Sequence, residues 1–105
     1  MFTRVVEIRC KAGKSNELSK TANEKALPIL RQQQGFQDEI ILTSSTDPDH
    51  VMALSFWNKR EDAERYHREQ YSKIAEMLRP LCEGEPKIST FDVNTSTAHH
   101  IGKAA

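Results

Sequence analysis

An α+β fold with the element order βαββαβ is what this chain of 105 residues predicts. Four stretches alternate polar and apolar residues with the period of a strand, and two longer stretches repeat apolar residues with the period of a helix. Turn-forming residues separate these stretches. The length suits one domain with a single core.

The first strand and the first helix occupy the N-terminal third of the chain. Residues 3–10 (TRVVEIRC) alternate roughly between polar and apolar, with β-branched enrichment. Residues 15–34 place apolar residues at helical spacing and end at Gly35, a residue that often terminates helices. Pro28 removes a backbone donor and crowds the preceding turn, so the helix should bend or break near Leu27.

A β-hairpin and a second helical region come next. Residues 36–45 (FQDEIILTSS) and 50–57 (HVMALSFW) are predicted strands, and TDPD supplies proline and aspartates for the turn between them. Asn58 is followed three residues later by Glu61, which resembles a capping box and predicts a helix that starts at Lys59.

The second helical region should break, and a last strand completes the order. The apolar residues Tyr66 and Tyr71 are too far apart for one helical stripe, which predicts a break near REQ. Residues 86–96 (PKISTFDVNTS) form the last predicted strand. We expect a domain over residues 1–97 and a tail over residues 98–105 that is ordered only if something docks it. The order is the ferredoxin-like arrangement, an antiparallel sheet with both helices on one face.

Both strands of the hairpin carry apolar residues on both faces, in IIL at 40–42 and VMAL at 51–54. Two helices can cover only one face of a sheet, and a large exposed apolar patch is uncommon on a monomer. The pattern therefore predicts a homodimer in which an identical sheet covers the second face.

The composition excludes several classes of function. Fifteen Lys and Arg balance fifteen Asp and Glu, so the basic excess typical of nucleic-acid-binding proteins is missing. No apolar run approaches a membrane span and the N-terminus does not resemble a signal peptide, so we expect a cytoplasmic protein that binds no membrane. Cys10 and Cys82 lack metal or redox spacing and should be reduced thiols. Phosphate loops, nucleophile elbows and zinc motifs are also missing, which favours chemistry without a metal or other cofactor.

Five stretches, taken together in this order, resemble those of a known family. They are KAGK, LPILRQQQGF, TDPD, SFWNKREDAERYH and LRPLCEGEPKISTFDV. Over nearly its whole length the chain resembles the antibiotic biosynthesis monooxygenase domain of the dimeric α+β barrel superfamily. The resemblance implies a cleft between the sheet and the helices that holds flat aromatic substrates. Some members oxidise phenols or quinols there with dioxygen and without metal, flavin or haem.

The resemblance is weaker for particular substrates. A branch that degrades haem uses an asparagine on the first strand and a tryptophan and a histidine on the second helical region, whereas TRVVEIRC has no asparagine and YSKIAEMLRPL no histidine. Members that oxidise polyketides share a tryptophan that matches Trp57. Their asparagine four residues earlier is Ala53 here, and their tyrosine six residues later is Ala63.

The candidate site residues follow from the resemblance and from side-chain chemistry. Trp57 is either a core residue or an apolar wall for a planar ligand. His67 is either a surface residue or the base that takes a phenolic proton near pH 7. Asn58 is a candidate hydrogen-bond partner for the developing oxyanion. The residues expected to line the cleft are Phe36, Met52, Tyr66, Tyr71 and Phe91.

Two functions from different classes are predicted. The first is a cofactor-independent monooxygenase or quinol oxygenase that acts on a small or polycyclic aromatic phenol or hydroquinone. The second is a non-catalytic dimeric module that binds an aromatic or apolar small molecule, which the alanines at positions 53 and 63 favour.

Overall fold

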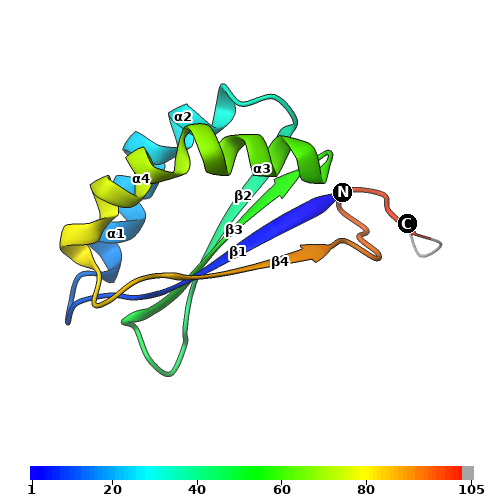
Figure 1. Ribbon diagram of the computed structural model, residues 1–105. Coiled ribbons are helices and arrows are strands. Elements are labelled where there is room, and N and C mark those ends of the chain that lie inside the picture. Colours follow the sequence, from blue (N-terminus) through cyan, green and yellow to red (C-terminus); the bar gives the residue numbers. More distant parts are fainter. Residues whose placement is uncertain (103–105) are drawn as a thin grey trace.

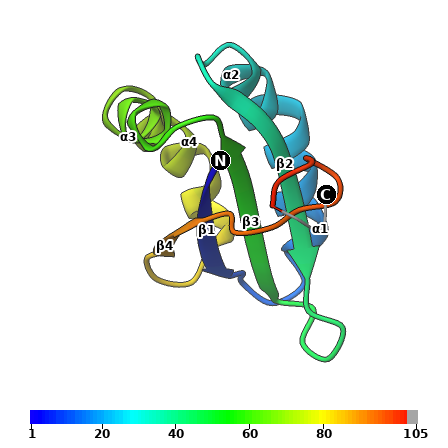
Figure 2. The same cartoon turned by 90° about the vertical axis from the view of Figure 1, so that its right-hand side faces the viewer.

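The computed structural model describes residues 1–102 and has the predicted α+β, ferredoxin-like architecture (Figure 1). Its sheet has four antiparallel strands in the spatial order β2-β3-β1-β4. The strands are β1 (Phe2–Arg9), β2 (Phe36–Thr43), β3 (His50–Trp57) and β4 (Lys87–Asp92). The helices lie on one face of the sheet and leave the other face bare (Figure 2).

The first helical region changes its winding just ahead of Pro28. It consists of α1 (Ser15–Thr21), a π-helical turn η1 (Ala22–Ala26) and α2 (Leu27–Arg31). Proline has no N–H group and its ring crowds the preceding turn, and a π-helical turn accommodates both by widening the helix there. The predicted irregularity near Leu27 is confirmed in this form.

The second helical region is broken where the spacing of its apolar residues predicts a break. It consists of α3 (Arg60–Glu69) and α4 (Tyr71–Leu78), followed by a 3-10 turn η2 (Arg79–Leu81). Gln70 separates the two helices with a φ of −128°, which lies outside the helical range.

The predicted capping box is wrong. Helix α3 begins one residue later than expected, with Lys59 at the N-cap, and no side chain caps it. The side chain of Asn58 is engaged elsewhere, because its Oδ1 accepts a hydrogen bond of 2.8 Å from Gln37 Nε2 on β2.

The core between the sheet and the helices is divided into two clusters. The first cluster contains Phe2, Ala26, Leu30, Trp57, Ala63, Tyr66 and Ile74. The second contains Ile8, Cys10, Leu18, Val51 and Cys82, of which both cysteines are free thiols. A small domain usually has one contiguous core. Leu78 packs against both clusters and connects them.

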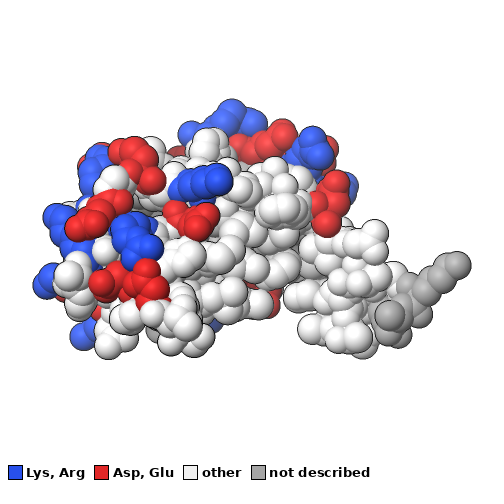
Figure 3. Space-filling model, turned by 90° about the horizontal axis from the view of Figure 1, so that it is seen from below, with Lys and Arg blue, Asp and Glu red and all other residues white. Residues whose placement is uncertain are grey.

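The face of the sheet opposite the helices exposes apolar side chains. Ile40, Leu42 and Phe91 are 39%, 47% and 55% exposed. Figure 3 views the molecule from this side and shows charged residues gathered mainly at one end and along the rim, with uncharged surface between them. We call this surface the bare face.

The predicted tail folds back toward the sheet over its described part. Ser96 and Ile101 form a β-bridge, and Figure 2 shows the segment crossing from β4 toward β2. The ring of His99 lies 5.6 Å from that of Phe56 on β3, centroid to centroid. Residues 103–105 of the tail lie outside the described residues. None of the helices within residues 1–102 has the length and apolar character that crossing a bilayer requires.

Candidate functional site

A hollow of about 80 Å³ lies between the sheet and the helices. Its wall takes side chains from both core clusters, among them Tyr66 from the first and Cys82 from the second. Four alanines also line it: Ala22, Ala26, Ala53 and Ala75. Because alanine leaves free the volume that a larger side chain would fill, these residues leave room for the hollow. We call this hollow the inner cavity.

Three polar residues form one row across the sheet at the floor of the inner cavity. Arg4 of β1 pairs with Ser55 of β3, and Ser55 pairs with Glu39 of β2. Residues in register on neighbouring strands point to the same face, and all three line the inner cavity. The Cα atoms of the two charged residues are two strand spacings apart, roughly 10 Å. An arginine and a carboxyl group therefore flank the cavity.

Arg4 is buried without a carboxylate partner. It is 4% exposed, and none of the ion pairs within residues 1–102 includes it. Its guanidinium carbon lies 5.1 Å from the ring centroid of Tyr66 and 4.7 Å from that of Tyr71. Burial lowers the pKa of Arg4 and the two tyrosines oppose that shift, so the side chain keeps its charge at neutral pH.

The guanidinium of Arg4 has more hydrogen-bond donors than the acceptors around it can take. Nη2 donates a hydrogen bond of 3.0 Å to Nδ1 of His67, and the Tyr66 hydroxyl is a second neighbour. A guanidinium has five N–H donors, so these acceptors cannot satisfy all of them. Within residues 1–102 no fully buried side-chain nitrogen or oxygen lacks a partner, and Arg4 lines both the inner cavity and a second hollow, so its remaining donors are available to a ligand there.

Arg4 also lines a second, more open hollow of about 410 Å³, which we call the outer groove. Among the described residues it is the one that the inner cavity and the outer groove share. The other residues of the outer groove are Phe2, Arg60, Ala63, Glu64, His67, Arg68, Ile88 and Thr90. The guanidinium thus stands at the boundary between the two spaces.

Glu39 lines the inner cavity, although it is not among the site residues predicted from the sequence. No ion pair within residues 1–102 includes its carboxyl group. Burial, together with the charge of Asp38, raises the pKa of Glu39 to about 7. A register shift between Phe36 and Asp38 alters the alternation of β2 and turns Glu39 toward the helices. A group with a pKa near neutrality can both take and return a proton.

The two tyrosines of the second helical region line the inner cavity beside Arg4. Burial raises the pKa of Tyr66 to about 12 despite the nearby guanidinium, and burial also raises the pKa of Tyr71. Both hydroxyls therefore stay protonated at neutral pH and can donate hydrogen bonds into the cavity.

His67 lines the outer groove rather than the inner cavity. An arginine can only donate, so Nδ1 of His67 must accept the bond from Arg4, and the neutral ring carries its proton on Nε2. Burial and the charge of Arg4 both lower the pKa of His67. Its ring stacks on Tyr71, with the centroids 5.2 Å apart. To accept a proton, Nδ1 would have to release the guanidinium.

The structure does not bring Trp57 or Asn58 to the wall of either hollow, although both are candidate site residues in the sequence. Trp57 is fully buried in the first core cluster and stacks on Tyr66 at 5.0 Å between centroids. Its Nε1 donates a hydrogen bond of 2.9 Å to Ser55 Oγ, which connects the indole to the polar row. Asn58 is exposed and lines neither hollow.

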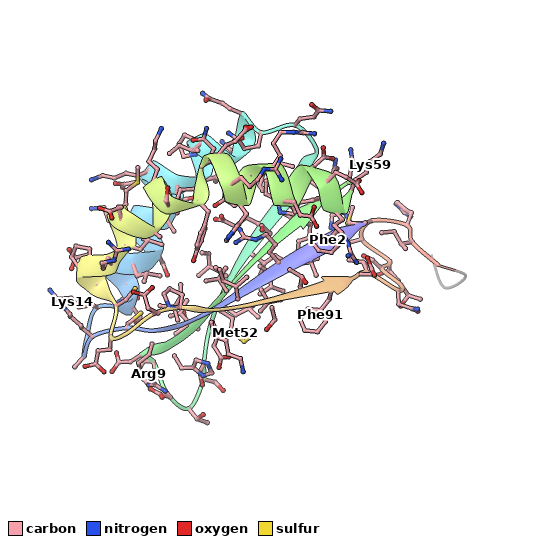
Figure 4. All side chains as sticks on the ribbon, viewed as in Figure 1. Phe2, Arg9, Lys14, Met52, Lys59 and Phe91 are labelled. Atoms are coloured by element: carbon pink, nitrogen blue, oxygen red, sulfur yellow. The ribbon has the colours of Figure 1, made fainter. Side chains whose placement is uncertain are left out.

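Three residues of the predicted cleft lining lie elsewhere. Phe36 packs edge-on against Trp57, with the centroids 5.5 Å apart, and lines neither hollow. Met52 and Phe91 point away from the helices (Figure 4). Strand alternation explains this placement, because each pairs with a β1 residue of the opposite face from Arg4. Within residues 1–102 no three His, Cys, Asp or Glu side chains gather as a metal site.

The fold and the inner cavity define a small α+β domain with a hollow between its sheet and its helices. The family model for antibiotic biosynthesis monooxygenases matches residues 1–76, and the chain belongs to this family. Among curated proteins, no sequence matches the chain significantly.

Solved structures support the same fold. A monooxygenase from the gene ActVA-Orf6 of Streptomyces coelicolor, in complex with the ligand nanaomycin D, has a TM-score of 0.79 at 19% identity, covering 90% of this chain and 88% of that one. SnoaB, a cofactor-independent oxygenase from Streptomyces nogalater, has a TM-score of 0.75 at 16% identity, covering 91% and 95%. A conserved protein from Methanosarcina mazei Go1 has a TM-score of 0.74 at 15% identity, covering 86% and 89%.

Proposed function

We propose that the protein is a cofactor-independent oxygenase that acts on a small aromatic phenol or hydroquinone, with dioxygen as the second substrate. The inner cavity carries this proposal, because it is a hollow with mainly apolar walls and two ionisable side chains without ion-pair partners at its floor. Membership of the family supports the class of reaction. Two proteins of similar fold are a monooxygenase and a cofactor-independent oxygenase.

The chemistry needs few protein groups. Loss of the hydroxyl proton turns an electron-rich phenol into an anion that passes an electron to dioxygen more readily. A positioned base contributes on the order of a hundredfold to ten-thousandfold, and a fixed charge beside the oxyanion adds a similar factor. Arg4 supplies that charge, and the candidate bases are His67, which the sequence predicts, and Glu39, which the structure adds.

The size of the inner cavity favours a one-ring substrate over a polycyclic one. Its volume of about 80 Å³ is far below the roughly 300–1,000 Å³ of sites for drug-sized ligands. The rings of Tyr66 and Tyr71 already occupy the side next to Arg4.

Oxygen uptake by purified, metal-free protein tests this function. We expect consumption proportional to protein concentration, faster with one-ring than with polycyclic hydroquinones, and unchanged by chelators. The variant Ala53→Leu should abolish it by filling the cavity from β3, whereas Ala12→Leu, at an exposed position, should not. Uptake at the rate of buffer alone, or an unaffected Ala53→Leu variant, would contradict the proposal.

We also infer that the bare face is covered by a second copy of the chain. Ile40, Leu42 and Phe91 are exposed there, and the surface between the charged rims is uncharged (Figure 3). A stable interface of standard size buries about 800 Å² on each partner, which the face of a four-stranded sheet can supply.

A non-catalytic module that binds an aromatic molecule is the second candidate. Ala53 lines the inner cavity and Ala63 the outer groove, and neither offers a hydrogen bond where the oxidising members that the sequence resembles carry polar side chains. Ligand-induced thermal stabilisation without oxygen uptake would favour this module.

A further inference from the structure

The two charges at the floor of the inner cavity are aligned but do not neutralise each other. Arg4 and Glu39 both pair with Ser55, and no ion pair within residues 1–102 includes either of them. Ser55 is held in place, since its hydroxyl accepts from Trp57 and its carbonyl accepts from Thr3. Two hydrogen bonds thus hold Ser55 in the middle of the row, and the inner cavity lies above it.

Such an arrangement is unfavourable for a core. Burial of an ionisable group without a partner opposes folding, and apolar residues at both positions would pack better. Positions that break this rule without compensation are characteristic of functional sites. Arg4 is 4% exposed and has no carboxylate partner within residues 1–102, and the groups around its guanidinium are the rings of Tyr66 and Tyr71 and Nδ1 of His67.

We propose that Arg4 and Glu39 are the two poles of the ligand site: Glu39 takes the proton of a ring hydroxyl, and Arg4 binds the oxygen at the opposite edge of the ring, where the negative charge gathers. The ligand class is a one-ring aromatic whose hydroxyl is conjugated through the ring with a carbonyl or a second oxygen. This assignment rests on the proposed function, since it places the substrate in the same cavity.

The proton transfer balances without a co-reactant. The O–H bond of the ligand breaks and an O–H bond forms on a carboxylate oxygen of Glu39. The electron pair left on the ligand delocalises through the ring to the oxygen that Arg4 binds. The total charge of the site is unchanged, but the negative charge moves from the far side of Ser55 into contact with the guanidinium, which is favourable in an enclosed cavity.

The matched isomers 4-hydroxyacetophenone and 3-hydroxyacetophenone test the assignment without any oxidation. In the 4-isomer the hydroxyl is conjugated with the carbonyl, and in the 3-isomer it is not. Near pH 7 the free 4-isomer is mainly neutral, and we expect its phenolate absorption band to grow on addition of the protein. The 3-isomer should give no band and bind at least tenfold more weakly. Equal binding of both isomers without a band would overturn the assignment.

Substitutions of Glu39 and Arg4, each paired with a control substitution at an exposed position, test the role of each residue. Glu39→Gln preserves the shape of the side chain and should abolish the phenolate band, whereas Glu24→Gln, exposed on η1, should leave it unchanged. Arg4→Lys keeps the charge but loses the planar fork, so it should weaken binding of the 4-isomer at least tenfold. Arg31→Lys, at an exposed position, is its control. Thermal unfolding of each variant verifies that it is folded, and a wild-type band in Glu39→Gln would overturn the role of Glu39.

Failure of this assignment and failure of the oxygenase proposal are distinguishable. If the wild-type protein ionises the 4-isomer but oxidises no hydroquinone, the oxygenase proposal is wrong and the assignment of Glu39 and Arg4 to the ligand site is supported. If neither Glu39→Gln nor Arg4→Lys changes the rate of hydroquinone oxidation, and the 4-isomer stays neutral, the assignment of Glu39 and Arg4 is wrong and the oxygenase proposal is supported.

Discussion

The two faces of the sheet depart from ordinary burial in opposite ways. Under the helices, the chain places the buried Arg4 and the half-buried Glu39 beside a cavity. On the bare face, Leu42 and Phe91 are exposed to solvent. Both departures cost stability in an isolated chain. The two proposals assign a missing component to each, a polar aromatic ligand to the covered face and an apolar partner surface to the bare face.

Strand β3 contributes side chains to both faces, because successive residues of a strand alternate between them. Trp57 points into the core, and Leu54, opposite Val5 of β1 and Ile40 of β2, points to the bare face. Substitutions on this one strand can therefore separate stability of the fold from association of the chains.

The largest effect is expected for Trp57→Ala. The indole is fully buried between Phe36 and Tyr66, and its removal should lower the free energy of unfolding by about 3 to 5 kcal/mol. Denaturant unfolding of the two proteins measures the difference. Phe91→Ala on the bare face is the control and should cost much less in the isolated chain, since Phe91 is already 55% exposed. A loss below about 1 kcal/mol for Trp57→Ala would contradict its place in the core.

The next effect is expected for Leu54→Asp. A charge at the middle of the bare face should weaken the proposed dimer by about 2 kcal/mol or more, roughly a thirtyfold rise in its dissociation constant. Light scattering across a concentration series measures this. Leu54→Met is the control and should remain dimeric. A wild-type protein that is monomeric at micromolar concentration would contradict the dimer itself.

A smaller effect on the covered face is expected for Glu39→Gln. The pKa of Glu39 is raised from 4.5 to about 7, so its ionisation is disfavoured in the folded state. The penalty begins as the pH rises through the ordinary range of the carboxyl group and is complete above about pH 7. After allowance for partial exposure, Glu39→Gln should stabilise the fold by about 1 kcal/mol at high pH and leave it unchanged below about pH 4.

Unfolding free energies at both pH values, with Glu24→Gln as the exposed control, measure this difference. The groups that face Glu39 are Asp38 beside it, Tyr66 across the cavity and Arg4 beyond Ser55. Tyr66 and Arg4 do not titrate in this range, because the pKa of Tyr66 is about 12 and Arg4 stays charged. An equal gain at both pH values would show that the gain does not come from the charge of Glu39.

The fold follows from the sequence pattern because its signals are local. The alternation of HVMALSFW predicts β3 with the bounds that the structure has, and the spacing around REQ predicts the break at Gln70. The alternation also contained a signal for Arg4, which shares its strand face with Val6 and Ile8. A charged residue in an otherwise apolar register is a candidate site residue.

The remaining site residues depend on irregular and long-range geometry. Glu39 points to the helices only because of the register shift after Phe36, which simple alternation cannot anticipate. The hydrogen bond from Arg4 to His67 joins residues 63 positions apart, so the sequence gives no reason to link them. Because Nδ1 of His67 accepts that bond, it cannot take a proton while the bond is in place.

The smallest effect is expected for His67→Asn, which distinguishes a positioning residue from a base. An asparagine side chain offers an amide oxygen in place of Nδ1 but cannot take a proton near neutral pH. If His67 only holds Arg4 over the tyrosine rings, His67→Asn should lower kcat less than about tenfold and leave the pH profile unchanged. His67→Ala, which leaves the guanidinium unsupported, should raise KM more than it lowers kcat. If His67 is the base that the sequence predicts, both variants should lose roughly a hundredfold or more in kcat, because a base acts in the transition state. Steady-state kinetics of both variants across the pH range decide between these roles. A roughly hundredfold loss of kcat in His67→Asn would identify His67 as the base.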